Sequence, residues 1–89
     1  MQQLAAIEEA LEIVRQTIEL LASRKDDEAA FDIARAQYRS SIRDSWPNNL
    51  SSLTDVLDRI HRDPGSKLDE AERARLAHAV HLLRNAMNQ

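Results

Sequence analysis

Apolar side chains recur at helical spacing through the first quarter of the chain. They stand three or four residues apart, and they are Leu4, Ile7, Leu11, Val14, Ile18 and Leu21. This heptad pattern predicts an amphipathic α-helix over residues 3–23. Beside the pattern, on a wheel with about 100° between residues, lie Ala6, Ala10, Ile13 and Leu20. The apolar arc then covers about 200°, whereas a surface helix needs a stripe of about 100°, so this helix needs cover on two sides.

A second helix is predicted over residues 27–43, after a polar stretch at residues 23–28 that interrupts the apolar pattern. Neither glycine nor proline breaks the chain there, so one continuous helix of about 40 residues is the alternative. The lost apolar pattern favours a helical hairpin, in which Asp26 or Asp27 caps the second helix. The predicted apolar stripe of this helix contains its bulky side chains and one alanine, at Phe31, Ala34, Tyr38 and Ile42.

A third helix is predicted over residues 52–62, because Pro47 and the asparagines after it are typical of a loop. Ser51 or Ser52 is placed to cap this helix, and Asp55 has the spacing that completes a capping box with Ser52. The narrow apolar face of the third helix consists of Leu53, Val56, Leu57 and Ile60.

The turn residues Asp63-Pro64-Gly65 end the third helix, and a fourth is predicted over residues 69–87. Asp69, with Glu72 three positions later, marks its start. Its core face consists of Leu76, Ala79, Val80, Leu83 and Met87. The sequence therefore predicts an all-α protein, an antiparallel bundle of three or four helices in a single domain 1–89, with a long N-terminal helical hairpin.

The residue composition supports this prediction and limits the classes of function. The 89 residues include one glycine and no cysteine, which argues against a β-rich fold and excludes disulfides and thiolate metal sites. A chain this short buries only about 60–65% of its unfolded surface, so oligomerisation would add stability. No apolar run approaches the roughly 20 residues of a membrane span, and no secretory signal is evident. We therefore expect a cytoplasmic protein.

No catalytic, cofactor or metal motif emerges from the sequence. Asp58 and His61, like His78 and His81, have the i, i+3 spacing of paired metal ligands. Pairing of the last two helices, however, would leave His78 about 12 Å along the axis from the position opposite His61. We therefore expect histidines on the solvated surface, no cofactor and no enzymatic activity.

Two surfaces and one loop residue are candidates for binding. The excess apolar flank of the first helix predicts a homodimer interface at Ala6, Ala10, Ile13 and Leu20. Trp46 either caps the open end of the bundle or anchors a partner, since tryptophan is enriched among binding hot spots. A ridge of arginines, which either contacts phosphates or pairs with Glu8 and Glu12, consists of Arg35, Arg39 and Arg43.

These observations predict a non-catalytic protein–protein interaction or regulatory module that acts as a homodimer. The alternative is a small nucleic-acid-binding regulator that uses the arginine ridge. The net charge of −3 disfavours nonspecific contact with nucleic acid, and the first hypothesis therefore ranks above the second.

Overall fold

The computed structural model describes residues 2–41 and 50–87, with side chains from residue 5 to 39 and from 50 to 87. These residues contain four helices and no strand, which confirms the all-α class. The helices are α1 (Gln2–Ser23), α2 (Asp27–Ser41), α3 (Ser51–Arg62) and α4 (Glu70–Met87). Their described ends lie within two residues of the predicted ones.

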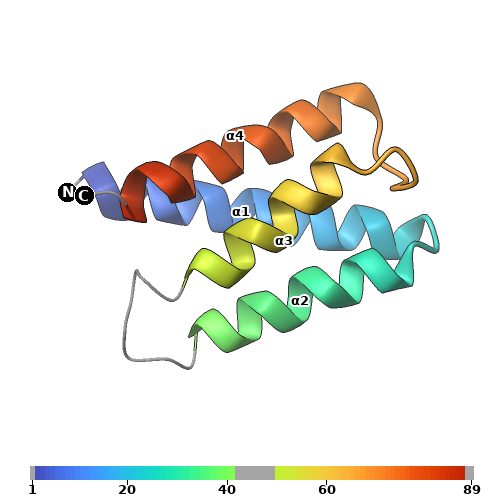
Figure 1. Ribbon diagram of the computed structural model, residues 1–89, viewed down its shortest axis with the longest axis horizontal. Coiled ribbons are helices and arrows are strands. Elements are labelled where there is room, and N and C mark those ends of the chain that lie inside the picture. Colours follow the sequence, from blue (N-terminus) through green and yellow to red (C-terminus); the bar gives the residue numbers. More distant parts are fainter. Residues whose placement is uncertain (1, 42–49, 88–89) are drawn as a thin grey trace.

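The four helices form a ring in which each helix packs against two others (Figure 1). Helix α1 contacts α2 and α4, and α3 contacts the same two helices. Successive helices run in opposite directions, with the α1–α2 and α3–α4 connections at the same end. The predicted antiparallel bundle is therefore confirmed, with all four helices present.

The α1–α2 hairpin turns at Lys25 without a glycine. Lys25 has a φ of 63°, in the left-handed region. Its N–H donates to the carbonyl of Ala22 at 3.1 Å, and the N–H of Asp26 donates to the carbonyl of Leu21 at 2.9 Å. This pair of bonds is a Schellman motif, which satisfies the last carbonyl groups of α1. The sequence therefore forms a hairpin and not one continuous helix.

Replacing Lys25 with glycine should raise the free energy of unfolding by about 0.5–1 kcal/mol. The left-handed conformation costs an L-residue about 1–2 kcal/mol, and the greater freedom of glycine in the unfolded chain cancels part of the gain. Urea denaturation measures the difference. The control Ala22→Gly, at an exposed position within α1, should destabilise the protein instead. A less stable Lys25→Gly variant would contradict the interpretation of this turn.

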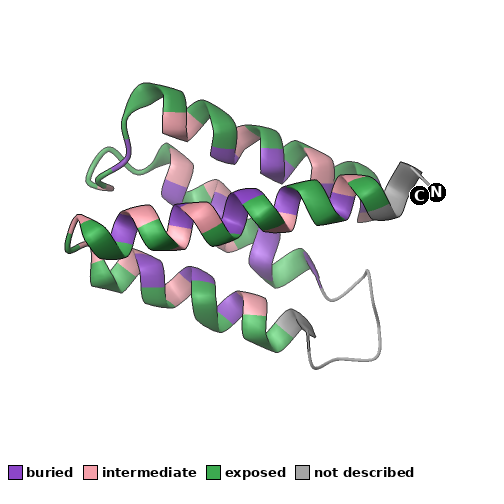
Figure 2. Ribbon diagram, turned by 180° about the vertical axis from the view of Figure 1, so that it is seen from behind, coloured by how far each residue is buried: buried purple, intermediate pink, exposed green. Residues whose placement is uncertain are grey.

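The core lies inside the ring of helices (Figure 2). Its largest fully buried side chains are Val14, Leu21, Ile33, Leu50, Leu53, Thr54, Leu57, Leu76 and Leu83. Two buried hydroxyl groups, those of Thr17 and Thr54, each donate at 2.8 Å to the backbone carbonyl four residues earlier. Because both hydroxyls have acceptors, they occupy the core without an unsatisfied donor.

Helix α1 is covered on two sides within one chain. Ala10 and Ile13 are only 0% and 5% exposed, while Ala6 and Leu20 are half-buried. Helix α4 packs along α1 and supplies this cover. This corrects the predicted dimer interface for Ala10 and Ile13, which are not exposed to a second copy. The broad apolar arc does need a second neighbour, and within the chain α4 takes that place.

Helix α3 begins differently from the prediction. Its N-cap is Leu50, which makes no side-chain capping hydrogen bond. The predicted capping box of Ser52 and Asp55 is therefore wrong. Leu50 is fully buried, so apolar packing rather than a serine hydroxyl fixes the start of this helix.

Helix α4 starts at the predicted pair Asp69 and Glu72, which forms a capping box. The N–H of Glu72 donates to Asp69 Oδ1, and the N–H of Asp69 donates to Glu72 Oε1, both at 2.8 Å.

Arg24, at the end of α1, donates to both carboxylate oxygens of Glu72 and, at 2.9 Å, to the carbonyl of Lys67. The Arg24 hydrogen bonds and the backbone N–H of Asp69 lower the pKa of Glu72 to about 2. This ion pair joins the end of α1 to the start of α4.

Arg73 holds the α3–α4 connection together. Its guanidinium group donates at 2.7–3.1 Å to four backbone carbonyl oxygens, those of His61, Asp63, Ser66 and Leu68. The carbonyls at the end of a helix lack partners within that helix. Arg73 therefore caps the end of α3 from the first turns of α4.

Candidate functional site

The outer face of α2 presents two large aromatic side chains to solvent. Phe31 is 60% exposed and Tyr38 is 66% exposed, and they are the only large hydrophobic side chains in the exposed class among the residues with described side chains. Ala34, which lies between them on the same face, is also exposed. We call Phe31, Ala34 and Tyr38 the α2 face. Exposed residues line the outer side of this helix (Figure 2).

The α2 face corrects the predicted orientation of the second helix. The side chains that α2 buries are Ala30, Ile33 and Ala36, not the aromatic stripe. Outside its charged arc, α2 is apolar almost all round, so helical periodicity alone did not determine which side turns inward. The alanines beside Ile33 allow α2 to approach its neighbours closely, whereas the predicted stripe would have placed two bulky rings in the core. The fourth residue of that stripe, Ile42, lies outside the described residues.

A cation–π contact orders one part of the α2 face. The guanidinium carbon of Arg35 lies 4.6 Å from the centroid of the Phe31 ring. Such contacts contribute about 0.5–1 kcal/mol at exposed sites. On a helical wheel Arg35 stands about 40° from Phe31, and this closeness to a charged residue was the sequence signal that Phe31 faces solvent.

Charge is divided along the exposed side of α2. The first turn carries the carboxylates of Asp27 and Glu28, and the last turn carries Arg39. Arg35 lies in the second half of the helix, and all four side chains are exposed. The helix therefore presents acidic side chains in its first turn, before Phe31, and basic side chains in its second half, where Arg35 and Arg39 lie on either side of Tyr38.

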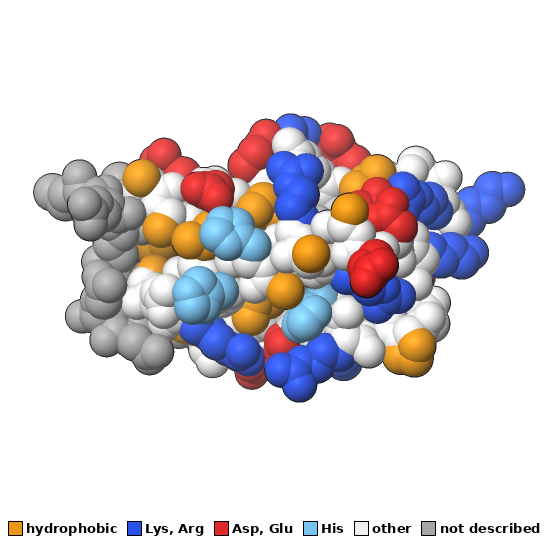
Figure 3. Space-filling view, turned by 90° about the horizontal axis from the view of Figure 1, so that it is seen from above, with side chains coloured by type: hydrophobic (Ala, Val, Ile, Leu, Met, Phe, Trp, Pro, Cys, Tyr) orange, Lys and Arg blue, Asp and Glu red, His pale blue; other side chains and the backbone are white. Residues whose placement is uncertain are grey.

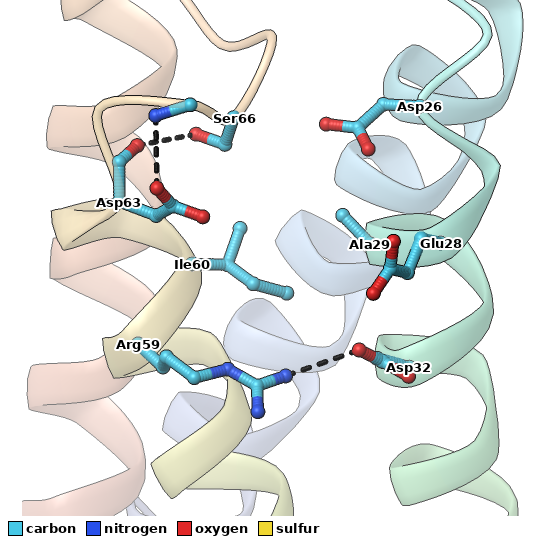
Figure 4. Close-up of a pocket in the computed structure, with 9 residues that line it drawn as sticks. Asp26, Glu28, Ala29, Asp32, Arg59, Ile60, Asp63 and Ser66 are labelled. Atoms are coloured by element: carbon cyan, nitrogen blue, oxygen red, sulfur yellow. Dashed lines mark hydrogen bonds and ion pairs between the residues drawn. The ribbon is translucent and has the colours of Figure 1, made fainter.

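A groove of about 300 Å³ runs between α2 and the end of α3 (Figure 4). Its lining residues are Asp26, Glu28, Ala29, Asp32, Arg59, Ile60, Asp63, Gly65 and Ser66. Three of the carboxylates already have partners. Asp26 accepts from the N–H of Lys67 at 3.2 Å, Asp32 accepts from Arg59 at 3.1 Å, and Asp63 Oδ1 accepts from the N–H of Gly65 at 2.8 Å. The groove is acidic, but part of its charge is neutralised within the fold.

A second depression, of about 170 Å³, shares the Asp32–Arg59 ion pair with that groove and brings together part of the predicted arginine ridge. It is lined by Asp32, Arg35, Ala36, Arg39, Ser52, Val56 and Arg59. Arg35 and Arg39 thus share a surface with Arg59, a residue that the sequence did not single out, while Arg43 lies outside the described residues. The sequence also predicted Glu8 and Glu12 as partners of the ridge, and of these Glu12 pairs with Arg15 of its own helix at 2.6 Å.

Histidine side chains from α3 and α4 lie on one face of the molecule (Figure 3). His61 contacts Asp58 at 3.0 Å, His78 contacts Glu9 at 3.0 Å, and His81 contacts Asn85 at 3.1 Å. His78 and His81 are exposed, as predicted, and His61 is partly buried. These three contacts are separate, so they give each histidine its own partner.

Asp58 is the centre of an ion-pair network between α3 and α4. Besides His61, it contacts Arg62 at 3.1 Å and Arg84 at 3.4 Å. Burial raises the pKa of Asp58, but the hydrogen bond from His61 and the positive charges of both arginines outweigh it and lower the pKa. The network holds the two helices together while its carboxylate stays ionised.

The predicted partner anchor, Trp46, lies outside the described residues. Leu20, from the predicted interface on α1, lines a shallow depression with Gln16 of α1 and Arg75 of α4. Of the surfaces that the structure describes, the α2 face is the one that exposes large apolar groups.

No family model matches the chain, and no similar protein was found among the curated proteins or the solved structures. None of the described helices has both the length and the apolar character that a membrane span requires. Functional inference therefore depends on the surfaces described above.

Proposed function

We propose that this chain is a non-catalytic protein–protein interaction or regulatory module of the cytoplasm, acting as a homodimer through the α2 face. The observation that carries the proposal is the exposure of Phe31 and Tyr38 on one side of one helix. This surface replaces the flank of α1 that the sequence predicted for the same role.

Two physical arguments support an interaction role for the α2 face. Phenylalanine and tyrosine are enriched in protein interfaces, and exposed apolar patches are typical of binding surfaces. The chain has one Phe and one Tyr, and it places both outside a small core that would gain stability from burying them. A second copy would cover them and add the stability that a chain of this size gains from association.

Replacing Phe31 and Tyr38 together with serine should abolish self-association. The change removes the two largest apolar groups of the α2 face. Both are exposed in the single chain, so the cost to the stability of the fold should be small and include the loss of the Arg35–Phe31 contact. Light scattering coupled to size exclusion, at several micromolar concentrations, measures the mass. We expect a concentration-dependent rise above 10.1 kDa, the mass of one chain, for the unchanged protein, and that mass at every concentration for the variant.

The matched control is Ala74→Ser, an exposed alanine of α4, which should leave association unchanged. If the unchanged protein keeps the mass of one chain up to millimolar concentration, the homodimer is wrong. Equal association of the Phe31→Ser, Tyr38→Ser variant and the unchanged protein would place the contact elsewhere than on the α2 face.

A second candidate is the nucleic-acid-binding regulator, which the convergence of Arg35, Arg39 and Arg59 on one depression supports. Two facts favour the first proposal over it: Arg59 is already paired with Asp32, and the chain is acidic overall. Titration with a generic DNA duplex separates the two hypotheses, because phosphate contacts produce binding that weakens steeply as salt rises. Binding of this kind by a chain that stays monomeric would favour the second candidate.

A further inference from the structure

The α2 face lies on a helix whose exposed charges differ at its two ends. Asp27 and Glu28 lie on the acidic half, and Arg35 and Arg39 lie on the basic half. A symmetric dimer brings the same patch of both copies together across a two-fold axis. The charge distribution therefore determines which relative orientation of the two α2 helices is favourable.

In a parallel pair, the acidic half of one α2 would lie against the acidic half of the other, and the basic halves would also meet. In an antiparallel pair, each acidic half lies against a basic half. Opposite charges attract and like charges repel across an interface, so charge pairs fix the register and orientation of docking. Antiparallel helix dipoles add to the same preference.

We infer that two copies dock through antiparallel α2 helices, with the two-fold axis between Phe31 and Ala34. This inference rests on the proposed function and names its partner surface. Such an axis places the ring of Phe31 opposite the small side chain of Ala34 in the other copy. It also places Glu28 opposite the stretch of the other copy that carries Arg35 and Arg39.

The size of the contact determines how tight the dimer is. Helix α2 has 15 residues, about 22 Å at 1.5 Å per residue. Two single helix faces of this length bury less than the roughly 1,200–2,000 Å² of a standard stable interface. We therefore expect a dimer weaker than a standard stable one, in which the charge pairs have a measurable share of the affinity.

Two charge variants test the orientation. The first-half variant carries Asp27→Lys and Glu28→Lys, so both ends of its α2 are basic, while Asp32 stays paired with Arg59. The second-half variant carries Arg35→Glu and Arg39→Glu, so its α2 is acidic throughout. In the antiparallel dimer each variant alone repels itself, and we expect its dissociation constant to rise about 10- to 100-fold. An equimolar mixture should restore a mixed dimer, because a basic helix then faces an acidic one. Sedimentation velocity of the full chain measures all three samples.

The control for the first-half variant carries Glu8→Lys and Glu70→Lys, which make the same change in net charge as that variant at exposed positions outside α2, and it should associate like the unchanged protein. A parallel pair would keep like charges together before and after each change, so undiminished association of both variants would overturn the antiparallel arrangement. If that happens while Phe31→Ser with Tyr38→Ser still abolishes the dimer, the proposed function stands without this geometry. Circular dichroism of each variant, and recovery of the dimer on mixing, separate lost docking from lost folding.

Discussion

Replacing Leu57 with alanine should lower the free energy of unfolding by about 2–5 kcal/mol. Leu57 lies at the middle of α3 and is fully buried among the four helices. Alanine removes most of its apolar surface and leaves a cavity that the packed helices fill only in part. Native domains of this length are stable by about 0.05–0.15 kcal/mol per residue, so the loss is a large fraction of the total. Urea denaturation followed by circular dichroism measures it.

The matched control is the same substitution at Leu20, which is only half-buried between α1 and α4. Leu20→Ala should lower the free energy of unfolding by clearly less than Leu57→Ala, because part of the Leu20 side chain already contacts water. Equal losses at Leu57 and Leu20 would show that the core is not packed as described.

Replacing Glu72 with alanine should cost about 2 kcal/mol at pH 7, since it removes both a helix cap and a charge-assisted hydrogen bond. The Glu72 side chain is 20% exposed and that of Arg24 is 36% exposed, so the value lies below that of a fully buried pair. The same change also removes the ion pair between the end of α1 and the start of α4, and leaves the hydrogen bond from Arg24 to the carbonyl of Lys67.

The pKa of Glu72 determines how the loss of stability in the Glu72→Ala variant depends on pH. The pKa of Glu72 falls from 4.5 to about 2 in the folded chain, so the folded state prefers the ionised carboxylate. Its contribution to stability is complete above pH 4.5 and disappears as the pH falls towards 2. Urea denaturation at pH 7 and pH 3 should show a smaller effect of Glu72→Ala at the lower pH.

Glu70→Ala is the control, because Glu70 is an exposed carboxylate in the same first turn of α4. At pH 7, Glu70→Ala should lower the free energy of unfolding by less than Glu72→Ala does. If Glu72→Ala and Glu70→Ala lose the same stability at both pH values, the ion pair with Arg24 contributes nothing.

The sequence predicts the helices well because the signals that define them are local. Apolar spacing and the Asp69–Glu72 capping box depend on residues within one or two turns, and the structure agrees with both. The start of α3 was misplaced because its N-cap, Leu50, is fixed by tertiary packing and not by a capping side chain. Local sequence patterns do not predict packing between residues that are far apart in the chain.

The candidate site was harder to predict, because it depends on how each helix is rotated within the bundle. The apolar arcs of both α1 and α2 are wide, and a wide arc fits several rotations with similar burial. For α1, the arc indicated a second neighbour but did not identify it as α4. For α2, the size of Phe31 and Tyr38 suggested the interior, whereas Ile33 and the alanines beside it pack there.

The ring arrangement of the helices has a consequence for the kinetics of folding. Three of the four helix pairs, α1–α2, α2–α3 and α3–α4, join neighbours along the chain, and only α1–α4 closes the ring over a long sequence separation. Helical proteins dominated by such local contacts fold in microseconds to milliseconds, because little loop entropy is lost before contacts form. We expect the α1–α4 closure to limit the folding rate, so substitutions along that pair should change this rate more than equally costly substitutions within either hairpin.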